Sequence, residues 1–295
     1  MEHDELLEEV RSALGTGALA SLQWGGQKQV FRSQLEDVPV AVKVVLVPEA
    51  STYAAEAIER ARREVELLAT VESPFVVRVL SEAIEIGERP EAVCWVEELL
   101  DGSDLRHVAS SFPWRAEEVW TLISDTASGL QACHELDVVH RDLSPGNVRR
   151  RASGRFVLMD PGFARHLSKE ALTGVYQPGT RNYSSPEHVP GGSPTPASDV
   201  FGLGILAFEA LTGRVPISYA GDDAAYYELL RTGQAAGVKT IRPDVPDELA
   251  AVVDQCLQRQ PARRYLDATE LLAEVEALSG AVGIPSPTSP TAGGE

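Results

Sequence analysis

The chain has 295 residues, which is enough for one large domain or two modest ones. Hydrophobic residues make up 43% of it and charged residues 24%, a composition typical of globular proteins with a sizeable core. Its 44 acidic residues outnumber the 26 basic ones, and the formal net charge of −18 argues against nucleic acids and anionic membranes as partners. The same charge would favour basic protein segments, although it also serves solubility alone.

The cysteines and the chain ends indicate where the protein works. Cys94, Cys133 and Cys256 lie too far apart in the sequence to form a zinc or redox motif, so we expect a reducing, cytoplasmic environment. The acidic N-terminus lacks the basic and apolar segments of a signal peptide, and no apolar run is long enough to span a membrane. Residues 279–295, rich in Pro, Ser, Thr and Gly, predict a disordered tail.

The N-terminal part of the chain predicts a small sheet with helices. Apolar residues at helical spacing indicate an amphipathic helix over residues 4–14, within an N-terminal extension of residues 1–17. Residues 18–47 change to short β-like runs separated by polar turns, which predicts an antiparallel sheet. A second amphipathic helix is expected over residues 52–70. Two further strands are expected downstream, at residues 76–80 and 92–96.

The chemistry of the chain centres on residues 140–147, which read HRDLSPGN, and on Asp160, which precedes Pro161 and Gly162. Short apolar runs come before both sites and predict buried strands that bracket a loop. The alternative interpretation is an ordinary charged loop whose side chains form local salt bridges. The flanking strands favour the functional interpretation. This combination resembles the catalytic loop and the metal-binding Asp of the protein kinases.

The resemblance implies the fold of a bacterial (Hanks-type) serine/threonine protein kinase. That fold is α+β and two-lobed, with a small antiparallel sheet and one helix in the N-lobe and a mainly helical C-lobe. The kinase domain would cover residues 18–278, with the N-lobe at about 18–97 and the C-lobe at about 98–278. Helical patterns are expected at residues 116–136, before the catalytic loop, and at residues 199–211.

The resemblance also implies a role for each polar residue at this centre. Phosphoryl transfer requires the protein mainly to position the acceptor hydroxyl and to neutralise phosphate charge. Asp142 would orient that hydroxyl and accept its proton, and Asn147 and Asp160 would hold the Mg²⁺ ions that bridge the phosphates of ATP. Arg141 would balance local charge and receive a phosphate from the activation segment, and His140 would be structural.

Residues 40–44, which read VAVKV, resemble the third strand of a kinase N-lobe. The resemblance implies that Lys43 reaches the α and β phosphates and pairs with a Glu on the following helix. Glu64 is the preferred partner, with Glu59 and Glu66 as alternatives. A lysine in an apolar strand could otherwise only extend its ammonium group to solvent from a sheet edge.

Residues 24–31, which read WGGQKQVF, occupy the place of the kinase Gly-rich loop, but the match is weak. Only Gly25 falls on a glycine position, and Lys28 falls on the third such position. Taken alone, the Gly25–Gly26 pair is more typical of a hairpin turn. The loss of glycines would loosen the clamp on the phosphates, and Lys28 could compensate by offering its charge.

Residues 97–102, which read EELLDG, resemble the hinge between the lobes. This alignment gives Glu97 the gatekeeper position and Leu100 the main adenine contact, although a charged gatekeeper is unusual in the family. The resemblance assigns nucleotide binding to eight residues, Gly25, Gly26, Lys28, Val30, Ala41, Lys43, Glu98 and Leu100.

Residues 179–187, which read GTRNYSSPE, resemble the end of an activation segment in the form found in kinases that modify Ser or Thr. Asp199 would hold the backbone of the catalytic loop, and Arg264 would pair with Glu187. The resemblance implies protein substrates, which the sequence does not identify, and autophosphorylation within the segment. The activation-segment candidates are Ser168, Thr173, Thr180 and Glu187.

Three departures from the family pattern leave other functions open. The glycine loop is degenerate, Ser144 stands where these kinases usually place a Lys, and Pro161 replaces a Phe. The losses of phosphate contacts favour one alternative, a pseudokinase that binds nucleotide or docks proteins without transferring phosphate. Residues 142–147 also resemble the loop of aminoglycoside and choline kinases, but those enzymes lack the motif that this chain has at residues 179–187.

Overall fold

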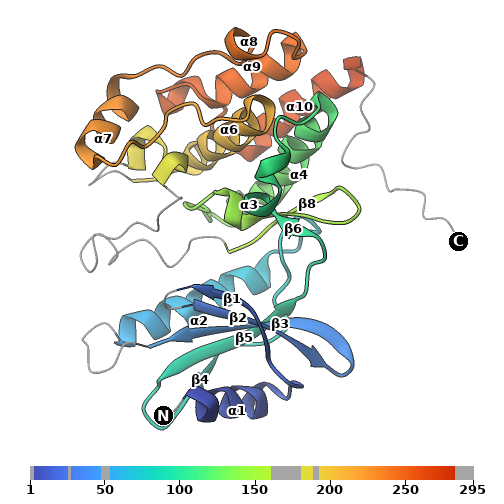
Figure 1. Ribbon diagram of the computed structural model, residues 1–295, viewed down its shortest axis with the longest axis vertical. Helices are drawn as coiled ribbons and strands as arrows, with labels where there is room; N and C mark the ends of the chain where they lie inside the picture. Colours follow the sequence, from blue (N-terminus) through green and yellow to red (C-terminus); the bar gives the residue numbers. More distant parts are fainter. Residues whose placement is uncertain (1–2, 26–27, 48–53, 161–180, 189–192, 283–295) are drawn as a thin grey trace, which may run out of the picture. The chain divides into compact units, whose positions relative to one another are not determined.

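The computed structural model describes residues 3–25, 28–47, 54–160, 181–188 and 193–282. The chain divides into two compact units, the first formed by residues 1–72 and 77–101 and the second by residues 73–76 and 102–295. The first unit is an antiparallel sheet with helices, and the second is mainly helical (Figure 1). The predicted two-lobed α+β fold is therefore confirmed.

The sheet of the first unit contains five strands in the order β1-β2-β3-β5-β4, and each neighbouring pair is antiparallel. Glu36 and Asp37 link the second strand to the third, and both have positive φ angles, of 48° and 67°. Such a two-residue turn matches the right-handed twist of the strands that it joins. The strands are β1 (Ala20–Gly25), β2 (Lys28–Leu35), β3 (Val38–Leu46), β4 (Ile84–Ile86) and β5 (Ala92–Glu98).

Two helices cover opposite faces of this sheet, α1 (His3–Leu14) and α2 (Ala54–Thr70) (Figure 1). The apolar side of α1 packs against alternate residues of β3 and β5, and its Val10 is fully buried. The apolar side of α2 packs against the other set, which includes Trp95. α1 therefore contributes to the core of the first unit.

Two boundaries differ from the sequence prediction. Residues 76–80 do not form a strand, because the pairing with β5 is limited to one bridge from Val79 to Glu97 and is interrupted where the Ser81 hydroxyl accepts the N–H of Val96. The last helix, α10 (Ala268–Val282), continues into the predicted tail. Gly283, a residue type that commonly ends helices, follows α10 directly in the sequence.

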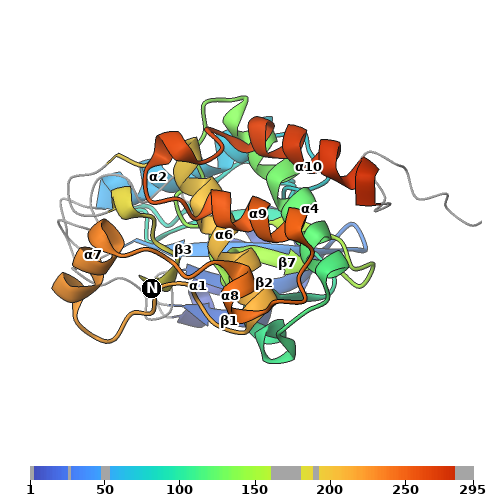
Figure 2. The same ribbon diagram turned by 90° about the horizontal axis from the view of Figure 1, so that it is seen from above.

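The second unit is organised around the helix α6 (Pro196–Thr212), which is buried on nearly all sides. It packs against α4 (Ala116–His134), α9 (Asp247–Cys256) and α10, as Figure 2 shows from above. Thr195 caps its N-terminus, and Gly213 ends it with a φ of 74°. The shorter helices are α3 (Leu105–Val108), α7 (Asp223–Thr232) and α8 (Val238–Ile241). Among the described residues, no helix has the length and apolar character needed to cross a membrane.

The second unit also contains a small three-stranded sheet, whose strands lie next to Asn147 and Asp160 in the sequence. It consists of β6 (Ser103–Asp104), β7 (Val148–Arg150) and β8 (Phe156–Leu158). Asp125 on α4 fixes β8, because its carboxylate accepts two hydrogen bonds from the Arg155 guanidinium at 2.7 and 2.8 Å and one from the backbone N–H of Phe156 at 2.9 Å. Asp125 is 1% exposed, so this anchor is shielded from water.

We expect that the replacement Leu6→Ala destabilises the first unit by about 2–5 kcal/mol, because it leaves a cavity between α1 and the sheet. Urea or thermal unfolding of the whole chain would measure the effect. The matched control is Leu22→Ala on β1, where the side chain is 52% exposed and little should change. Equal stability of Leu6→Ala and the wild type would show that α1 is not part of the core.

Candidate active site

The β7–β8 hairpin brings together the two polar segments that the sequence analysis singled out. Asn147 immediately precedes β7, and Asp160 lies two residues beyond β8. Val148 and Leu158 are paired in the hairpin, and the backbone N–H of Met159 donates to the carbonyl oxygen of Asn147 at 2.8 Å. The hairpin register therefore fixes the spacing between the metal-binding candidates.

Asp199, in the first turn of α6, anchors the backbone of the loop at residues 140–147. Its carboxylate accepts the backbone N–H of His140 at 2.7 Å and that of Arg141 at 2.8 Å. The Nε2 atom of His134 on α4 lies 3.1 Å from the same carboxylate. Asp199 is 1% exposed, and its position at a helix N-terminus favours the negative charge.

The backbone of Arg141 has a strained conformation, and the hydrogen bond from its N–H to Asp199 helps to hold it. The N–H of Asp142 donates to the carbonyl oxygen of His140 at 2.9 Å, and Arg141 between them has a φ of 65°. This is the geometry of a γ-turn with a positive central φ, a rare conformation for a bulky residue. Such strain persists where surrounding bonds overdetermine the backbone, and it is common at functional sites.

The buried ring of His140 links the two acid-bearing segments. Burial lowers the pKa of His140 more than the nearby carboxylates raise it, so the ring is neutral at pH 7. Its Nδ1 accepts the backbone N–H of Asp142 at 3.3 Å, and its Nε2 lies 3.1 Å from the carbonyl oxygen of Met159. A neutral ring with its proton on Nε2 satisfies both contacts, so His140 joins Asp142 to the residue before Asp160.

Asn147 orients the side chain of Asp142. The amide Nδ2 of Asn147 donates to the backbone carbonyl of Asp142 at 2.7 Å and to its carboxylate oxygen Oδ2 at 3.1 Å. Because both contacts use the amide nitrogen, the oxygen Oδ1 of Asn147 is the atom that this side chain can offer to a cation. Asp160, like Arg141, has a positive φ, of 46°, which an Asp tolerates better than most residues.

An ion pair between Glu187 and Arg264 joins residues 181–188 to the helices of the second unit. The Arg264 guanidinium contacts both carboxylate oxygens of Glu187, at 2.7 and 2.9 Å, and the Ser198 hydroxyl donates to the same carboxylate at 2.7 Å. Burial alone would raise the pKa of Glu187, but the bonds from Arg264 and Ser198 hold it below its ordinary value. The Arg264–Glu187 contact expected from the sequence is present.

The first unit carries its own group of charges, on the face of the sheet next to α2. Lys43 Nζ lies 2.6 Å from the Glu97 carboxylate, and Lys28 Nζ lies 3.2 Å from that of Glu64. The Trp95 indole N–H donates to Glu97 at 2.7 Å. The structure thus gives Lys43 a partner on β5 that the sequence analysis did not assign, and the expected pair with Glu64 stays a prediction.

The family described as Protein kinase domain matches residues 9–275, nearly the whole of both units. The chain belongs to the protein kinase family. It is 30% identical over 259 residues to the probable serine/threonine-protein kinase PknB of Lactococcus lactis, a match that covers 85% of this chain and 40% of that protein. It is 28% identical over 257 residues to the serine/threonine-protein kinase PrkC of Bacillus subtilis, covering 85% and 38%.

A third relative is matched over more of its length. The kinase domain is 32% identical over 277 residues to the serine/threonine-protein kinase PknL of Mycobacterium tuberculosis, and the match covers 90% of this chain and 66% of PknL. The chain spans less than half of the length of the relatives from Lactococcus and Bacillus.

The remaining candidates of this kinase domain lie partly within the described residues. Gly25 is paired with Lys28 across the β1–β2 hairpin, Val30 lies opposite Lys43, and Ala41 lies opposite Glu97. Glu98 and Leu100 follow at the end of β5, where Leu100 is buried and Glu98 accepts the backbone N–H of Arg78 at 2.9 Å. The candidates Gly26, Ser168, Thr173 and Thr180 lie outside the described residues.

Sequence reasoning missed two residues of the site, Trp95 and His134. β5 is buried along nearly its whole length, so its burial pattern gives no signal, and Trp95 shares the face of Lys43 because the two residues are paired in the register. His134 ends α4 at a distance of 65 residues from Asp199, and no local signal connects the two. Contacts of this kind depend on how α4 and α6 pack.

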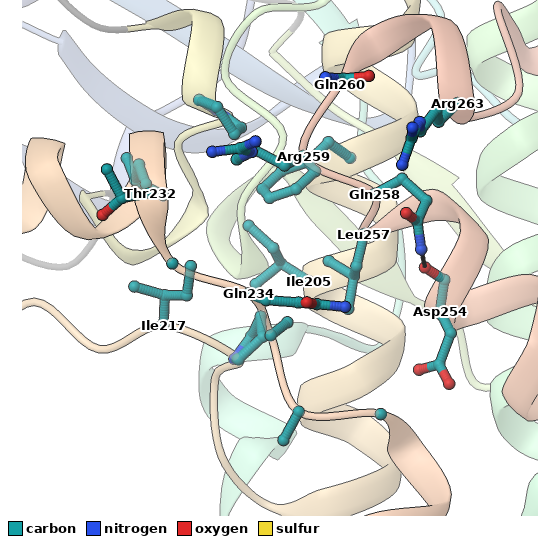
Figure 3. Close-up of a pocket in the computed structure, with 18 of the residues that line it drawn as sticks. Ile205, Ile217, Thr232, Gln234, Asp254, Leu257, Gln258, Arg259, Gln260 and Arg263 are labelled. Carbon is teal, nitrogen blue, oxygen red and sulfur yellow. Dashed lines mark hydrogen bonds between the residues drawn. The ribbon is translucent and has the colours of Figure 1, made fainter.

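A cavity of about 320 Å³ in the second unit is not part of this site. Figure 3 shows its wall, where Ile205 of α6 faces Leu257 and the Gln258 side chain donates to the carbonyl oxygen of Asp254. Arg259 and Arg263 lie at one side of it (Figure 3). None of residues 140–147 lines the cavity, so it does not contribute to the chemistry discussed above.

We expect the replacement Asp199→Ala to release the catalytic loop, because two buried backbone N–H groups lose their acceptor at about 1–3 kcal/mol each. Hydrogen–deuterium exchange of peptides containing residues 138–143 should become faster. Asp199→Asn, which keeps one carbonyl oxygen, should give an intermediate rate. Unchanged exchange in Asp199→Ala would contradict the anchoring role.

We expect Glu187→Gln to destabilise the protein by about 2–4 kcal/mol at pH 7, because it leaves the buried Arg264 without its counterion. The pKa of Glu187 is lowered in the folded state, so its contribution is complete above about pH 5 and is lost as the pH falls through that lowered pKa. The stability difference between the two proteins should therefore shrink in acid.

Urea unfolding at several pH values would measure this difference. The matched control is Glu228→Gln, which removes an exposed pair with Arg231 and should change little at any pH. A difference that stays constant down to pH 2 would contradict a pH-dependent pair.

Proposed function

We propose that the chain is an ATP-dependent serine/threonine protein kinase, which transfers the γ-phosphate of ATP to a hydroxyl of a protein substrate and phosphorylates its own activation segment. The observation that supports this most strongly is the arrangement of Asp142, Asn147 and His140 on a backbone held by Asp199. The names of the relatives point the same way.

Asp142 is the residue that would orient the acceptor hydroxyl and accept its proton. Asn147 holds one carboxylate oxygen in place, and the γ-turn at Arg141 fixes the backbone from which the side chain projects. A preorganised carboxylate of this kind suits phosphoryl transfer, in which the protein contributes mainly positioning and electrostatic stabilisation.

Asn147 Oδ1 and the Asp160 carboxylate are the oxygen ligands that would hold Mg²⁺. Hard cations prefer carboxylate and carbonyl oxygens, and Mg²⁺ usually takes few protein ligands and completes its shell with substrate phosphates and water. The described residues contain no group of three or more His, Cys, Asp and Glu that could enclose a metal, which fits this shared coordination. When bound, Mg²⁺ would neutralise charge on the β and γ phosphates.

The sheet face of the first unit supplies the remaining nucleotide contacts. Lys28 and Lys43 offer ammonium groups for the phosphates, while Val30 and Ala41 on the same face, with Glu98 and Leu100 at the end of β5, would meet the adenosine. Glu64 on α2 supports this group through Lys28.

Arg141 would receive the activation-segment phosphate. Its Nε is buried without a hydrogen-bond partner among the described residues, a cost that an incoming anion would remove. A phosphate on Ser168, Thr173 or Thr180 would supply that anion.

The three cysteines are buried and unpaired, which supports the proposed cytoplasmic location.

The test is phosphate incorporation measured by intact-mass analysis after incubation with Mg²⁺ and ATP, with and without a basic protein substrate. Asp142→Ala should lower the rate by about 10²–10⁴-fold, because the hydroxyl is no longer oriented or deprotonated. Asp244→Ala, which removes an exposed carboxylate, is the control and should react normally.

A wild-type chain that binds nucleotide but transfers no phosphate would contradict the kinase proposal and favour a pseudokinase. Faster transfer to small alcohols than to any protein would favour the small-molecule phosphotransferase.

A further inference from the structure

Arg106, on the short helix α3, lies against the loop that carries Asp142 and Asn147. A β-carbon on Gly146 of that loop would lie 2.9 Å from the Cζ atom of Arg106, 3.0 Å from its Nε and 3.2 Å from its Nη1. These separations are shorter than an ordinary van der Waals contact between heavy atoms. A larger residue at position 146 would therefore displace the guanidinium, and the glycine leaves room for it.

One carboxylate holds the guanidinium from α3 itself. The Nη2 atom of Arg106 lies 3.0 Å from Asp104, whose side chain is 7% exposed. Asp104 also accepts the backbone N–H of His107 at 3.3 Å and lies 2.8 Å from its Nδ1. Asp104 is the N-cap of α3 through the bond from His107, so the cap does not require Arg106.

Arg106 keeps donors for a further partner. Its side chain is 47% exposed, and Asp104 is its one hydrogen-bond partner among the residues that the structure describes. A guanidinium has five N–H donors, so Nε and Nη1 can bind a second anion while Nη2 stays on Asp104. The structural alternative is that Arg106 only stabilises α3, but a half-exposed ion pair contributes little to stability.

The guanidinium lies near the residue that would orient the acceptor hydroxyl. The amide of Asn147 bonds to the Asp142 carboxylate at 3.1 Å, and Asn147 directly follows Gly146. Since successive Cα atoms are about 3.8 Å apart, the guanidinium lies within about 15 Å of that carboxylate. An extended peptide covers such a distance with about five residues. A side chain of a bound substrate could therefore reach Arg106.

The acidic balance of the whole chain does not oppose a local preference for acids. The formal net charge is −18, but at physiological ionic strength interactions between exposed charges are screened beyond about 8 Å. A carboxylate hydrogen-bonded to a guanidinium lies about 3 Å from it, well inside that distance. Arg106 therefore dominates the interaction at this point of the surface.

We propose that Arg106 is a specificity-determining residue, which selects protein segments that carry Asp or Glu within about five residues of the acceptor hydroxyl. The inference rests on the proposed kinase function, because it assumes that the acceptor binds at Asp142. Arg106 takes no part in the transfer of the phosphate. It binds the acidic side chain of the substrate through charge-assisted hydrogen bonds.

The experiment measures kcat and KM for short peptides with a single Thr, in which Glu, Gln or Arg is placed in turn at each position up to about five residues away. For the wild type, the best Glu peptide should exceed the matching Gln peptide about tenfold in kcat/KM, mainly through a lower KM. Arg106→Gln should remove this preference, and Arg106→Lys should retain most of it. Arg106→Glu should favour the Arg peptide instead, because the sign of the charge is reversed.

The matched control is Arg231→Gln, which removes an exposed arginine that pairs with Glu228 on α7. This variant should keep the preference of the wild type for the Glu peptide. Thermal unfolding of each variant would show that it is folded, and Arg106→Gln should melt close to the wild type because its ion pair is half exposed.

A wild type without preference for Glu would overturn the proposal, and so would a preference that survives in Arg106→Gln and Arg106→Glu. A higher KM for ATP in Arg106→Gln, with the KM for the peptide unchanged, would instead assign Arg106 to the nucleotide and also overturn it. Self-phosphorylation without transfer to any peptide would overturn it too, because an acidic residue near the acceptor would then not suffice for recognition. A wild type that transfers no phosphate at all would refute the kinase function itself, and it is therefore measured first.

Discussion

The candidate active site depends on one buried carboxylate, that of Asp199. Its two oxygens hold consecutive backbone N–H groups of the catalytic loop, and this fixes a γ-turn that Arg141 would not adopt unaided. The N-terminal end of α6 stabilises the charge, and the packing of α6 between α4, α9 and α10 keeps the carboxylate in place. A buried, apolar helix therefore determines the geometry of the polar loop at residues 140–147.

Two other carboxylates of the second unit anchor a segment of the chain in a similar way. Asp125 ties β8 to α4 through Arg155, and Glu187 ties the end of the activation segment to Arg264. In each case a shielded carboxylate meets a guanidinium and a further hydrogen-bond donor, so its oxygens are satisfied. Buried pairs of this type add little net stability, but they exclude alternative arrangements because a misplaced partner leaves an unpaired charge. β8 and Glu187 are thus each held in one arrangement by the helices of the second unit.

The fold of the second unit could be predicted because local motifs in the sequence indicate it. Residues 140–147 and 179–187 have fixed spacings, and apolar runs mark the strands between them. The irregular segment 76–80 could not be predicted, because it depends on where the backbone pairing with β5 ends rather than on composition. His134 was missed because its contact with Asp199 depends on how α4 and α6 pack.

The ion pairs of the first unit were harder to predict from the sequence than the fold. Sequence position suggests Glu64 for Lys43, but which acid reaches which lysine depends on side-chain direction across the sheet. The register places Glu97 opposite Ala41, one diagonal step from Lys43, within reach of two long side chains. The signal was present in β5, where the charged residue Glu97 follows directly on an apolar run and is itself buried.

Charge balance explains why the unusual residues of the first unit belong together. On the sheet face next to α2, Lys43 and Glu64 alone would carry no net charge. Glu97 adds a buried negative charge, which would repel the phosphates of ATP unless another cation were present. Lys28, the first residue of β2, adds a positive charge and restores neutrality. The charges on this face of the sheet are therefore balanced within the first unit, because two lysines meet two buried or half-buried carboxylates.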